Sequence, residues 1–264
     1  MLNNKKHVLF IGAGRMAQAI IAGLIKKEGL HITVTNSGNQ ERLDYVSNRF
    51  GVEAVVNWED AVMTADVIFL ASPPSSQELI LKELSNFIKK QLVVTVAAGL
   101  GTGYLESLLP EGTSTAWVMP NTAAELGGSS TLYTTGQHMT EDQLDLLKVI
   151  LRAIGEYEEV TEQQVKELTA ITGSSPAFVY KFAKALVENA CQSGVSEEQA
   201  RRIVAQMIVG SSAMLSSGEN PQELMNQVAT PGGSTAEGIK VLEEGNFEGL
   251  IMQAIEACRK KASE

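Results

Sequence analysis

The sequence is poor in the residues that several functional classes require. Only two cysteines occur among its 264 residues, Cys191 and Cys258, and both fall in helix-like segments. Two isolated cysteines do not make a disulfide framework, so we expect small, buried, reduced thiols in a cytoplasmic protein. No apolar run has the length of a membrane span, and the run 8–11 is too short for a signal peptide.

Histidine and basic runs are equally scarce. The formal net charge is −10, and no dense Lys/Arg cluster is present, which argues against a nucleic-acid partner. The three histidines, His7, His31 and His138, lie outside every motif described below. This disfavours a histidine-dependent 2-hydroxy-acid dehydrogenase. We predict no metal site.

The first 160 residues alternate short apolar runs with amphipathic stretches, which is typical of a parallel sheet with crossover helices. We therefore predict an α/β, Rossmann-type doubly wound domain over residues 1–160. The expected strands are 7–11, 31–35, 66–71, 92–97 and 115–119, with weaker ones near 130–134 and 156–160. The expected helices include 15–27, 40–50, 75–88 and 141–153.

From residue 161 onward, strand-like runs disappear. Thr161 and Gln164 have the spacing of a helix-capping box, and glycines break the later segments. Residues 161–264 are predicted to be all helical and, being rich in Ala and Met, to bury apolar surface against another subunit. A monomeric bundle is the alternative. The expected helices are 161–171, 175–193, 197–217, 221–229, 235–244 and 247–261.

A glycine loop follows the first predicted strand and precedes a predicted helix, the setting of a dinucleotide-binding turn. Gly12 permits the tight turn, and Gly14 lets the backbone approach a pyrophosphate at the helix N-terminus. Ala17 stands at the third glycine position. The predicted cofactor contacts of this loop are Gly12, Ala13, Gly14, Arg15 and Met16.

About twenty residues further on, enzymes that use NADH usually carry an acidic residue for the ribose. Here the loop contains Asn36, Ser37 and Gly38 and no acid. A 2′-phosphate would not be repelled, so NADPH is the favoured cofactor, with NADH possible. The loop has no arginine, and Arg15 is a candidate partner for that phosphate.

Two further segments of small residues follow predicted strands, where the ligand crevice of such a sheet lies. Ala71, Ser72 and Pro73 follow one strand, and Ala97, Ala98 and Gly99 follow another. These residues are predicted to pass close to the ribose and nicotinamide. Ordinary strand-to-helix turns explain them equally well.

Two glycine-and-hydroxyl loops lie between predicted helices, at 173–177 and 231–235. Backbone N–H groups and hydroxyls at a helix N-terminus suit a small carboxylate. A cofactor cradle combined with an anion cradle points to a dehydrogenase or reductase.

Three segments, 118–122, 168–178 and 230–235, together resemble pyrroline-5-carboxylate reductase, and the resemblance runs along essentially the whole chain. It implies an N-terminal Rossmann domain and a helical dimerisation domain that often builds larger rings. It also implies NADPH-dependent formation of proline in an active site between the cofactor domain and the helical domains of two subunits.

The resemblance also implies roles for single residues. Thr235 would hydrogen-bond the imine nitrogen, although it could instead cap a helix. Asn121 would orient the nicotinamide or a water. The substrate carboxylate would be held by Thr230, Gly232, Gly233 and Ser234, opposite a wall made of Gly173, Ser174, Ser175 and Pro176.

The cofactor side departs from the family pattern. Ser72-Pro73 stands where the family usually has Val-Lys-Pro, and Asn36-Ser37-Gly38 replaces Asn-Arg-Ser. These changes leave open a cofactor-binding paralogue without catalysis. A second alternative is a β-hydroxyacid dehydrogenase that would use Lys181, but Ala185 stands where that family has asparagine.

Overall fold

The computed structural model describes residues 5–262, which divide into two compact units. The first comprises residues up to Gly173 together with the last residues of the chain, and the second comprises Ser174–Lys260. The predicted domain boundary at residue 160 differs from this division by 13 residues and stays a prediction.

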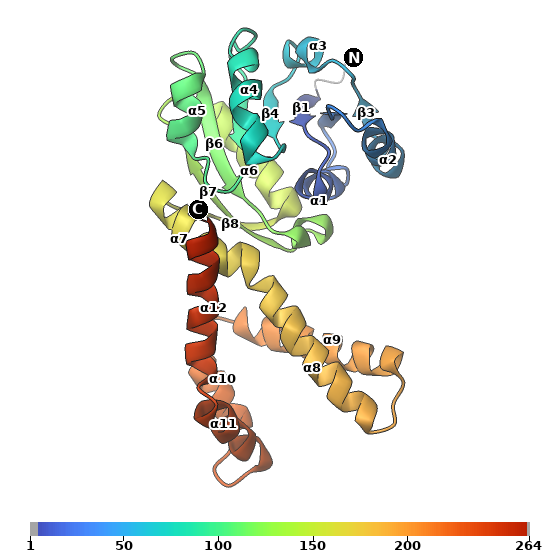
Figure 1. Cartoon of the computed structure of the whole chain (residues 1–264), viewed down its shortest axis with the longest axis vertical. Helices are drawn as coiled ribbons and strands as arrows, with labels where there is room; N and C mark the ends of the chain where they lie inside the picture. The colour runs from blue at the N-terminus through green and yellow to red at the C-terminus, as the bar shows by residue number, and fades with distance from the viewer. Residues whose placement is uncertain (1–4, 263–264) are drawn as a thin grey trace. The chain divides into compact units, whose positions relative to one another are not determined.

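An eight-stranded sheet forms the centre of the first unit, counted over the described residues (Figure 1). Its strand order is β3-β2-β1-β4-β5-β6-β7-β8. β1 to β6 run parallel, whereas β7 is antiparallel to β6 and parallel to β8. The strands are β1 (Lys6–Ile11), β2 (Leu30–Thr35), β3 (Glu53–Ala54), β4 (Val67–Leu70), β5 (Leu92–Thr95), β6 (Ser114–Met119), β7 (Ser129–Thr135) and β8 (Gly155–Glu159).

Helices cover both faces of this sheet, because successive strand residues point to opposite sides. On β1, Val8 and Phe10 pack against α1, α2 and α6, whereas Leu9 and Ile11 pack against α3, α4 and α5. These helices are α1 (Arg15–Leu24), α2 (Gln40–Phe50), α3 (Trp58–Val62), α4 (Pro74–Leu84), α5 (Thr102–Leu108) and α6 (Glu141–Ile154). The doubly wound sheet predicted from the sequence is confirmed.

Three short helical segments complete the first unit. They are the 3₁₀ helix η1 (Thr122–Leu126), α7 (Glu162–Thr169) and the π-helical turn η2 (Ala170–Ser174). The predicted capping box at the start of α7 is present, because the Thr161 hydroxyl accepts the Gln164 N–H and the Gln164 side chain caps Thr161 in return. Val165 of α7 packs beneath Trp117 and Leu132.

The second unit is entirely helical and has almost no buried interior of its own. It contains α8 (Pro176–Gln192), α9 (Glu197–Leu215), α10 (Pro221–Val228), α11 (Ser234–Glu244) and α12 (Phe247–Ala262). Within 174–260, only Ala200 and Val204 of α9 are buried in the single chain. The expectation of buried cysteines is wrong, because Cys191 and Cys258 are only half-buried.

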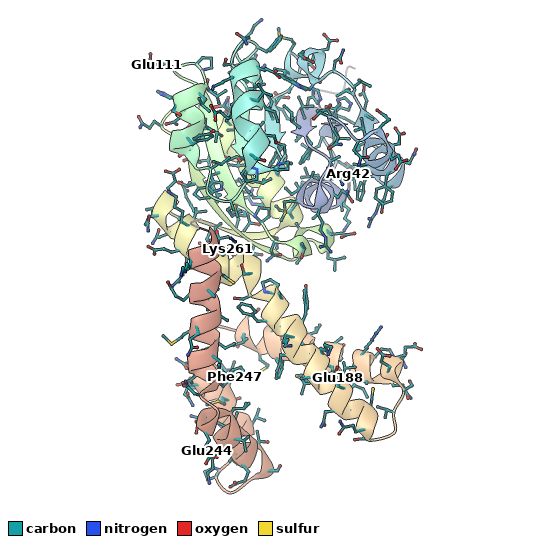
Figure 2. All side chains as sticks on the ribbon, in the orientation of Figure 1. Arg42, Glu111, Glu188, Glu244, Phe247 and Lys261 are labelled. Carbon is teal, nitrogen blue, oxygen red and sulfur yellow. The ribbon has the colours of Figure 1, made fainter. Side chains whose placement is uncertain are left out.

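Large apolar side chains instead point outward from this helical unit. Met252 is 71% exposed, and Phe247, labelled in Figure 2, is 44% exposed. Others in the same condition are Val179, Tyr180, Phe182, Ile203, Met207, Val209, Met214, Leu215, Val228, Val241, Leu242 and Leu250. An apolar surface of this kind marks an interaction site in a folded protein. None of the described helices has the length and apolar character needed to cross a membrane.

Candidate cofactor and substrate sites

A pocket of about 840 Å³ lies at the carboxyl ends of β1, β2, β4 and β5. This is where the strand order reverses between β1 and β4, the place at which open α/β sheets bind ligands. Most of the predicted cofactor residues line it: Gly12, Gly14, Arg15, Met16, Asn36, Ser37, Ala71, Ser72, Pro73, Ala97 and Ala98.

The glycine loop has the close packing that a dinucleotide turn requires. Gly12 adopts a φ of +114°, and a Cβ there would lie 2.7 Å from backbone atoms of Ala71 and Ser72. Above Gly14, by contrast, the nearest atom to such a Cβ is the Ala71 carbonyl oxygen at 3.7 Å. Gly14 is the N-cap of α1 and offers no side chain to the first N–H groups of the helix. No side chain caps those N–H groups, and Gly14, Arg15 and Met16 line the pocket, as a pyrophosphate site needs.

Asn36 connects this loop to the start of α2. Its Oδ1 accepts the Ala13 N–H at 3.2 Å, and its Nδ2 donates to the Asn39 carbonyl oxygen at 3.2 Å. Both ends of the amide are thus occupied by the protein. Asn36 fixes the edge of the pocket, and Ala13 is buried beneath it.

Gln77, which was not predicted from the sequence, supports the wall of the pocket from behind the lining. This fully buried side chain donates to the carbonyl oxygens of Leu70 and Ser72, and it accepts a hydrogen bond from the Thr95 hydroxyl. It therefore holds the β4–α4 turn against β5. The sequence does show a polar residue one turn into a helix that follows a buried strand. That pattern does not identify the hydrogen-bond partners of Gln77.

Ser72 lies on the same turn and lines the pocket. Its Oγ is buried and has no hydrogen-bond partner among the described residues. A buried hydroxyl without a partner is costly, so a ligand in the pocket that supplied one would bind more tightly. The glycine turn, the uncapped helix and this hydroxyl together fit a bound dinucleotide.

Three predicted cofactor contacts lie outside the pocket lining: the buried Ala13, Gly99 and Asn121. Gly99 sits in the turn after β5 with a φ of +81°. Asn121 is buried; its Oδ1 accepts the Ala123 N–H, and its Nδ2 donates to the Thr172 carbonyl oxygen at 3.0 Å. Asn121 thereby anchors the π-helical turn η2 to the end of β6.

The predicted carboxylate loop at 230–235 forms the N-terminus of α11. The Gly233 N–H donates to the Thr230 carbonyl oxygen at 2.9 Å, and Gly232 has a φ of +76°. The helix cap is Gly233, which provides no side-chain hydrogen bond. The alternative reading of Thr235 as a cap is therefore wrong. Thr235 stands inside the first turn, exposed, with no hydroxyl partner among the residues described.

The other loop falls at the junction of the two units. Gly173 and Ser174 belong to η2, Ser175 is the N-cap of α8, and Pro176 is its first residue. The units divide between Gly173 and Ser174. Proline suits a first helical position because its missing N–H would have no helical partner there.

Comparison with known proteins places these features in one family. Residues 162–264 match the family model for the pyrroline-5-carboxylate reductase dimerisation domain. Residues 7–99 match the model described as NADP oxidoreductase, coenzyme F420-dependent.

Full-length relatives decide the assignment. Pyrroline-5-carboxylate reductase 1 of Bacillus subtilis is 32% identical, over 99% of this chain and 90% of its own length. Pyrroline-5-carboxylate reductase 3 of Danio rerio is 37% identical over 97% of this chain and 90% of its own. This chain belongs to the pyrroline-5-carboxylate reductase family.

Solved structures of the family agree with this chain in three dimensions. The enzyme from Coxiella burnetii is 32% identical, has a TM-score of 0.87 and is matched over 98% of both chains. The Plasmodium falciparum enzyme, solved with NADP bound, is 26% identical with a TM-score of 0.88, over 99% of this chain and 98% of its own.

Family membership makes the chain an oxidoreductase, and it does not favour either alternative left open by the sequence. Lys181, the residue on which the β-hydroxyacid dehydrogenase reading depends, is exposed on α8. The match to the dimerisation domain also indicates a homo-oligomer and accounts for the outward-facing apolar helices of the second unit. Among residues 5–262, no group of His, Cys, Asp and Glu side chains is arranged to hold a metal ion.

Proposed function

We propose that this chain reduces 1-pyrroline-5-carboxylate to L-proline with NADPH, the last step of proline biosynthesis. The observation that carries the proposal is the pairing of full-length family relatives with a dinucleotide-shaped pocket at the switch point of the sheet. When bound, NADPH supplies the hydride that the imine carbon receives.

The first unit holds the cofactor through its backbone. Gly12 and Gly14 allow the pyrophosphate to approach the uncapped N–H groups of α1. Ser72 Oγ offers a hydrogen bond from the β4–α4 turn, which Gln77 holds in place. The small side chains of Ala97 and Ala98 line the end of the pocket beyond β5 and leave room for the ribose and nicotinamide.

The second unit supplies the groups for the imino acid. The N–H groups at the start of α11 have no side-chain cap, so with Thr230 and Ser234 they are available to the substrate carboxylate. Ser174, Ser175 and Pro176, together with Gly173 at the end of the first unit, form the second set of substrate contacts.

The Thr235 hydroxyl hydrogen-bonds the ring nitrogen. A protonated imine needs no strong base: hydride adds to carbon, the C=N π pair moves to nitrogen, and the proton already there remains. Thr235 then has to orient the nitrogen rather than transfer a proton. The catalytic gain comes mainly from holding the two reactants in register.

Replacing Thr235 tests this assignment. Thr235→Val, which keeps the shape and removes the hydroxyl, is expected to lower kcat about 10- to 100-fold, the loss of one hydrogen bond to a charged group. Thr235→Ser is expected to restore most of it. Turnover is followed by NADPH absorbance with proline quantified as product, and NADPH binding, measured separately by fluorescence, should not change.

Two outcomes would contradict the proposal at different levels. Full activity of Thr235→Val would remove Thr235 from the reaction while leaving the enzyme assignment intact. Absence of proline formation by the folded wild-type protein with either NADPH or NADH would remove the reductase assignment itself.

The same proposal extends to assembly. We assign the exposed apolar surface of α8 to α12 to a homodimer interface, supported by the dimerisation-domain match over residues 162–264. The cofactor pocket, by contrast, is lined by residues 11–98 of the first unit.

A further inference from the structure

The loop after β2, at the edge of the cofactor pocket, lacks a cationic side chain for the 2′-phosphate of NADPH. The 2′-phosphate of NADPH is a dianion, and an arginine near the end of the second strand is the usual partner for such a group. The loop after β2 contains Asn36, Ser37 and Gly38, none of them charged. The amide of Asn36 is already bonded at both ends, to Ala13 and Asn39. A cation for this phosphate has to come from elsewhere.

Arg42 is placed to provide it. It lies in the first turn of α2, six residues beyond Asn36, and lines the pocket together with Asn36, Ser37 and Asn39. Its backbone is fixed, because its N–H donates to the Asn39 Oδ1 at 2.8 Å. Its side chain is exposed at the rim of the first unit, as Figure 2 shows.

The Arg42 guanidinium has no ion-pair or hydrogen-bond partner among residues 5–262, which separates it from the other arginine of the helix. Arg49, two turns further on, is paired with the Glu125 carboxylate at 2.6 Å and donates to the Tyr45 hydroxyl at 2.7 Å. Arg49 is thus committed to the protein, whereas Arg42 is a free cation at the pocket edge. The acidic residues of the lining are Glu59 of α3 and Glu83 of α4.

We propose that Arg42 binds the adenosine 2′-phosphate and sets the preference of this chain for NADPH over NADH. The Ser37 hydroxyl, on the same edge, is the second donor. Asn36 acts as a positioning residue, since it ties the glycine loop to the turn that carries Arg42. The inference rests on the proposed function, because it assigns one group of the same cofactor.

Direct binding measurements test the proposal without relying on turnover. Dissociation constants for NADPH, NADH and adenosine 2′,5′-bisphosphate are measured by titration calorimetry on the full-length protein. Arg42→Ala is expected to weaken NADPH and the bisphosphate about 10- to 100-fold, the loss of a charge-assisted hydrogen-bonded pair, and to leave NADH within about twofold. Arg49→Ala, on the same helix but outside the pocket, is the matched control and should change none of the three.

A compensating variant sharpens the test. Placing arginine in the loop, as Ser37→Arg in the Arg42→Ala background, should recover most of the NADPH affinity because the loop faces the same edge of the pocket.

Three results would overturn the proposal. Equal losses for NADPH and NADH in Arg42→Ala would show that Arg42 does not read the 2′-phosphate. A selective loss in Arg15→Ala with Arg42→Ala unchanged would assign the phosphate to the glycine loop. Failure of the folded wild-type protein to bind any dinucleotide would instead remove the proposed function, and this inference with it.

Discussion

The two units of this chain differ in how they bury their apolar side chains. The sheet of the first unit is buried on both faces: Val8, Phe10, Val67 and Phe69 lie in one layer and Leu9 in the other, all at most 1% exposed. The helices of the second unit have comparable apolar content but almost no interior, with only Ala200 and Val204 buried among residues 174–260.

This difference in burial determines whether each unit can hold its loops in place without another subunit. A domain with its own core fixes the positions of its loops without help, and the cofactor pocket is defined entirely within residues 11–98. A helical unit without a core exposes apolar area that costs free energy until another surface covers it. Its shape therefore depends on assembly, and so does any role of its loops.

The largest expected effect is on the core of the first unit. Phe69→Ala removes a side chain that is 1% exposed and stacks on Phe10 with 4.9 Å between ring centroids. We expect a loss of about 3–5 kcal/mol in the free energy of unfolding, the usual cost of a large-to-small core change. Denaturant unfolding at several protein concentrations should give the same loss at each, because no subunit contact is involved.

Met63→Ala is the matched control in the same unit, since Met63 is 48% exposed. A surface change of this kind should alter stability by less than about 0.5 kcal/mol. A Phe69→Ala loss below about 1 kcal/mol, or one that varied with protein concentration, would break the contrast between the units.

The second prediction concerns the helical unit. Met207→Glu places a charge on the outward face of α9, one turn from the exposed Ile203. Burying an unpaired carboxylate in an interface is strongly unfavourable, so we expect self-association to weaken at least about 100-fold, equivalent to about 2.7 kcal/mol. Sedimentation velocity should show smaller particles. In denaturant unfolding, the loss of stability relative to the wild type should vary with protein concentration, unlike the loss in Phe69→Ala.

Leu126→Glu tests whether any exposed apolar residue would behave in this way. Leu126 is 83% exposed but belongs to η1 of the first unit. The Leu126→Glu variant should therefore have the same oligomeric state as the wild type. If Leu126→Glu dissociated the oligomer and Met207→Glu left it intact, the interface would lie on the first unit, and its assignment to the helical unit would be wrong.

The elements that could be predicted from the sequence are those whose signals are local. α2 was predicted at 40–50 and runs from Gln40 to Phe50, because the Asn39 cap and the left-handed Gly51 mark both ends. The two-residue β3 and the short helices α3 and α5 were missed, since each is too short to show a repeating apolar pattern. α1 and α4 end three and four residues earlier than predicted, at Leu24 and Leu84.

The residues of the cofactor site also differ in whether local sequence could predict them. The glycine loop was predictable because Gly12 and Gly14 act through their own backbone, next to the strand and helix that identify them. Gln77 was not, because its contact with Thr95 joins α4 to a neighbouring strand and appears only in the folded chain. Arg42 was not, because nothing local to α2 shows that its side chain lines the pocket and lacks a partner among the described residues. Asn36 was predicted as a cofactor contact, but the partners that occupy its amide appear only in the folded chain.

The smallest expected effect is a pH dependence confined to the first unit, because residues 174–260 contain no histidine. His7 is 7% exposed, its ring is 4.8 Å from that of His31, and it contacts the hydroxyls of Thr33 and Thr64. Burial, and secondly the His31 ring, lower the pKa of His7 below its ordinary value of 6.5, although Asp66 and Glu53 nearby oppose the shift.

The sign follows from which state binds the proton more tightly. The unfolded chain takes up a proton on His7 near pH 6.5, whereas the folded chain does so only at lower pH, so His7 destabilises the fold as pH falls below about 6.5. Denaturant unfolding at pH 8, 6.5 and 5.5 should show the first unit weakening at the acid end. His7→Asn should flatten that slope, whereas His138→Asn, an exposed position before α6, should not. If His7→Asn left the slope of stability against pH unchanged, the acid sensitivity would lie in another group. If the helical unit lost stability first at acid pH, the pH dependence would not be confined to the first unit.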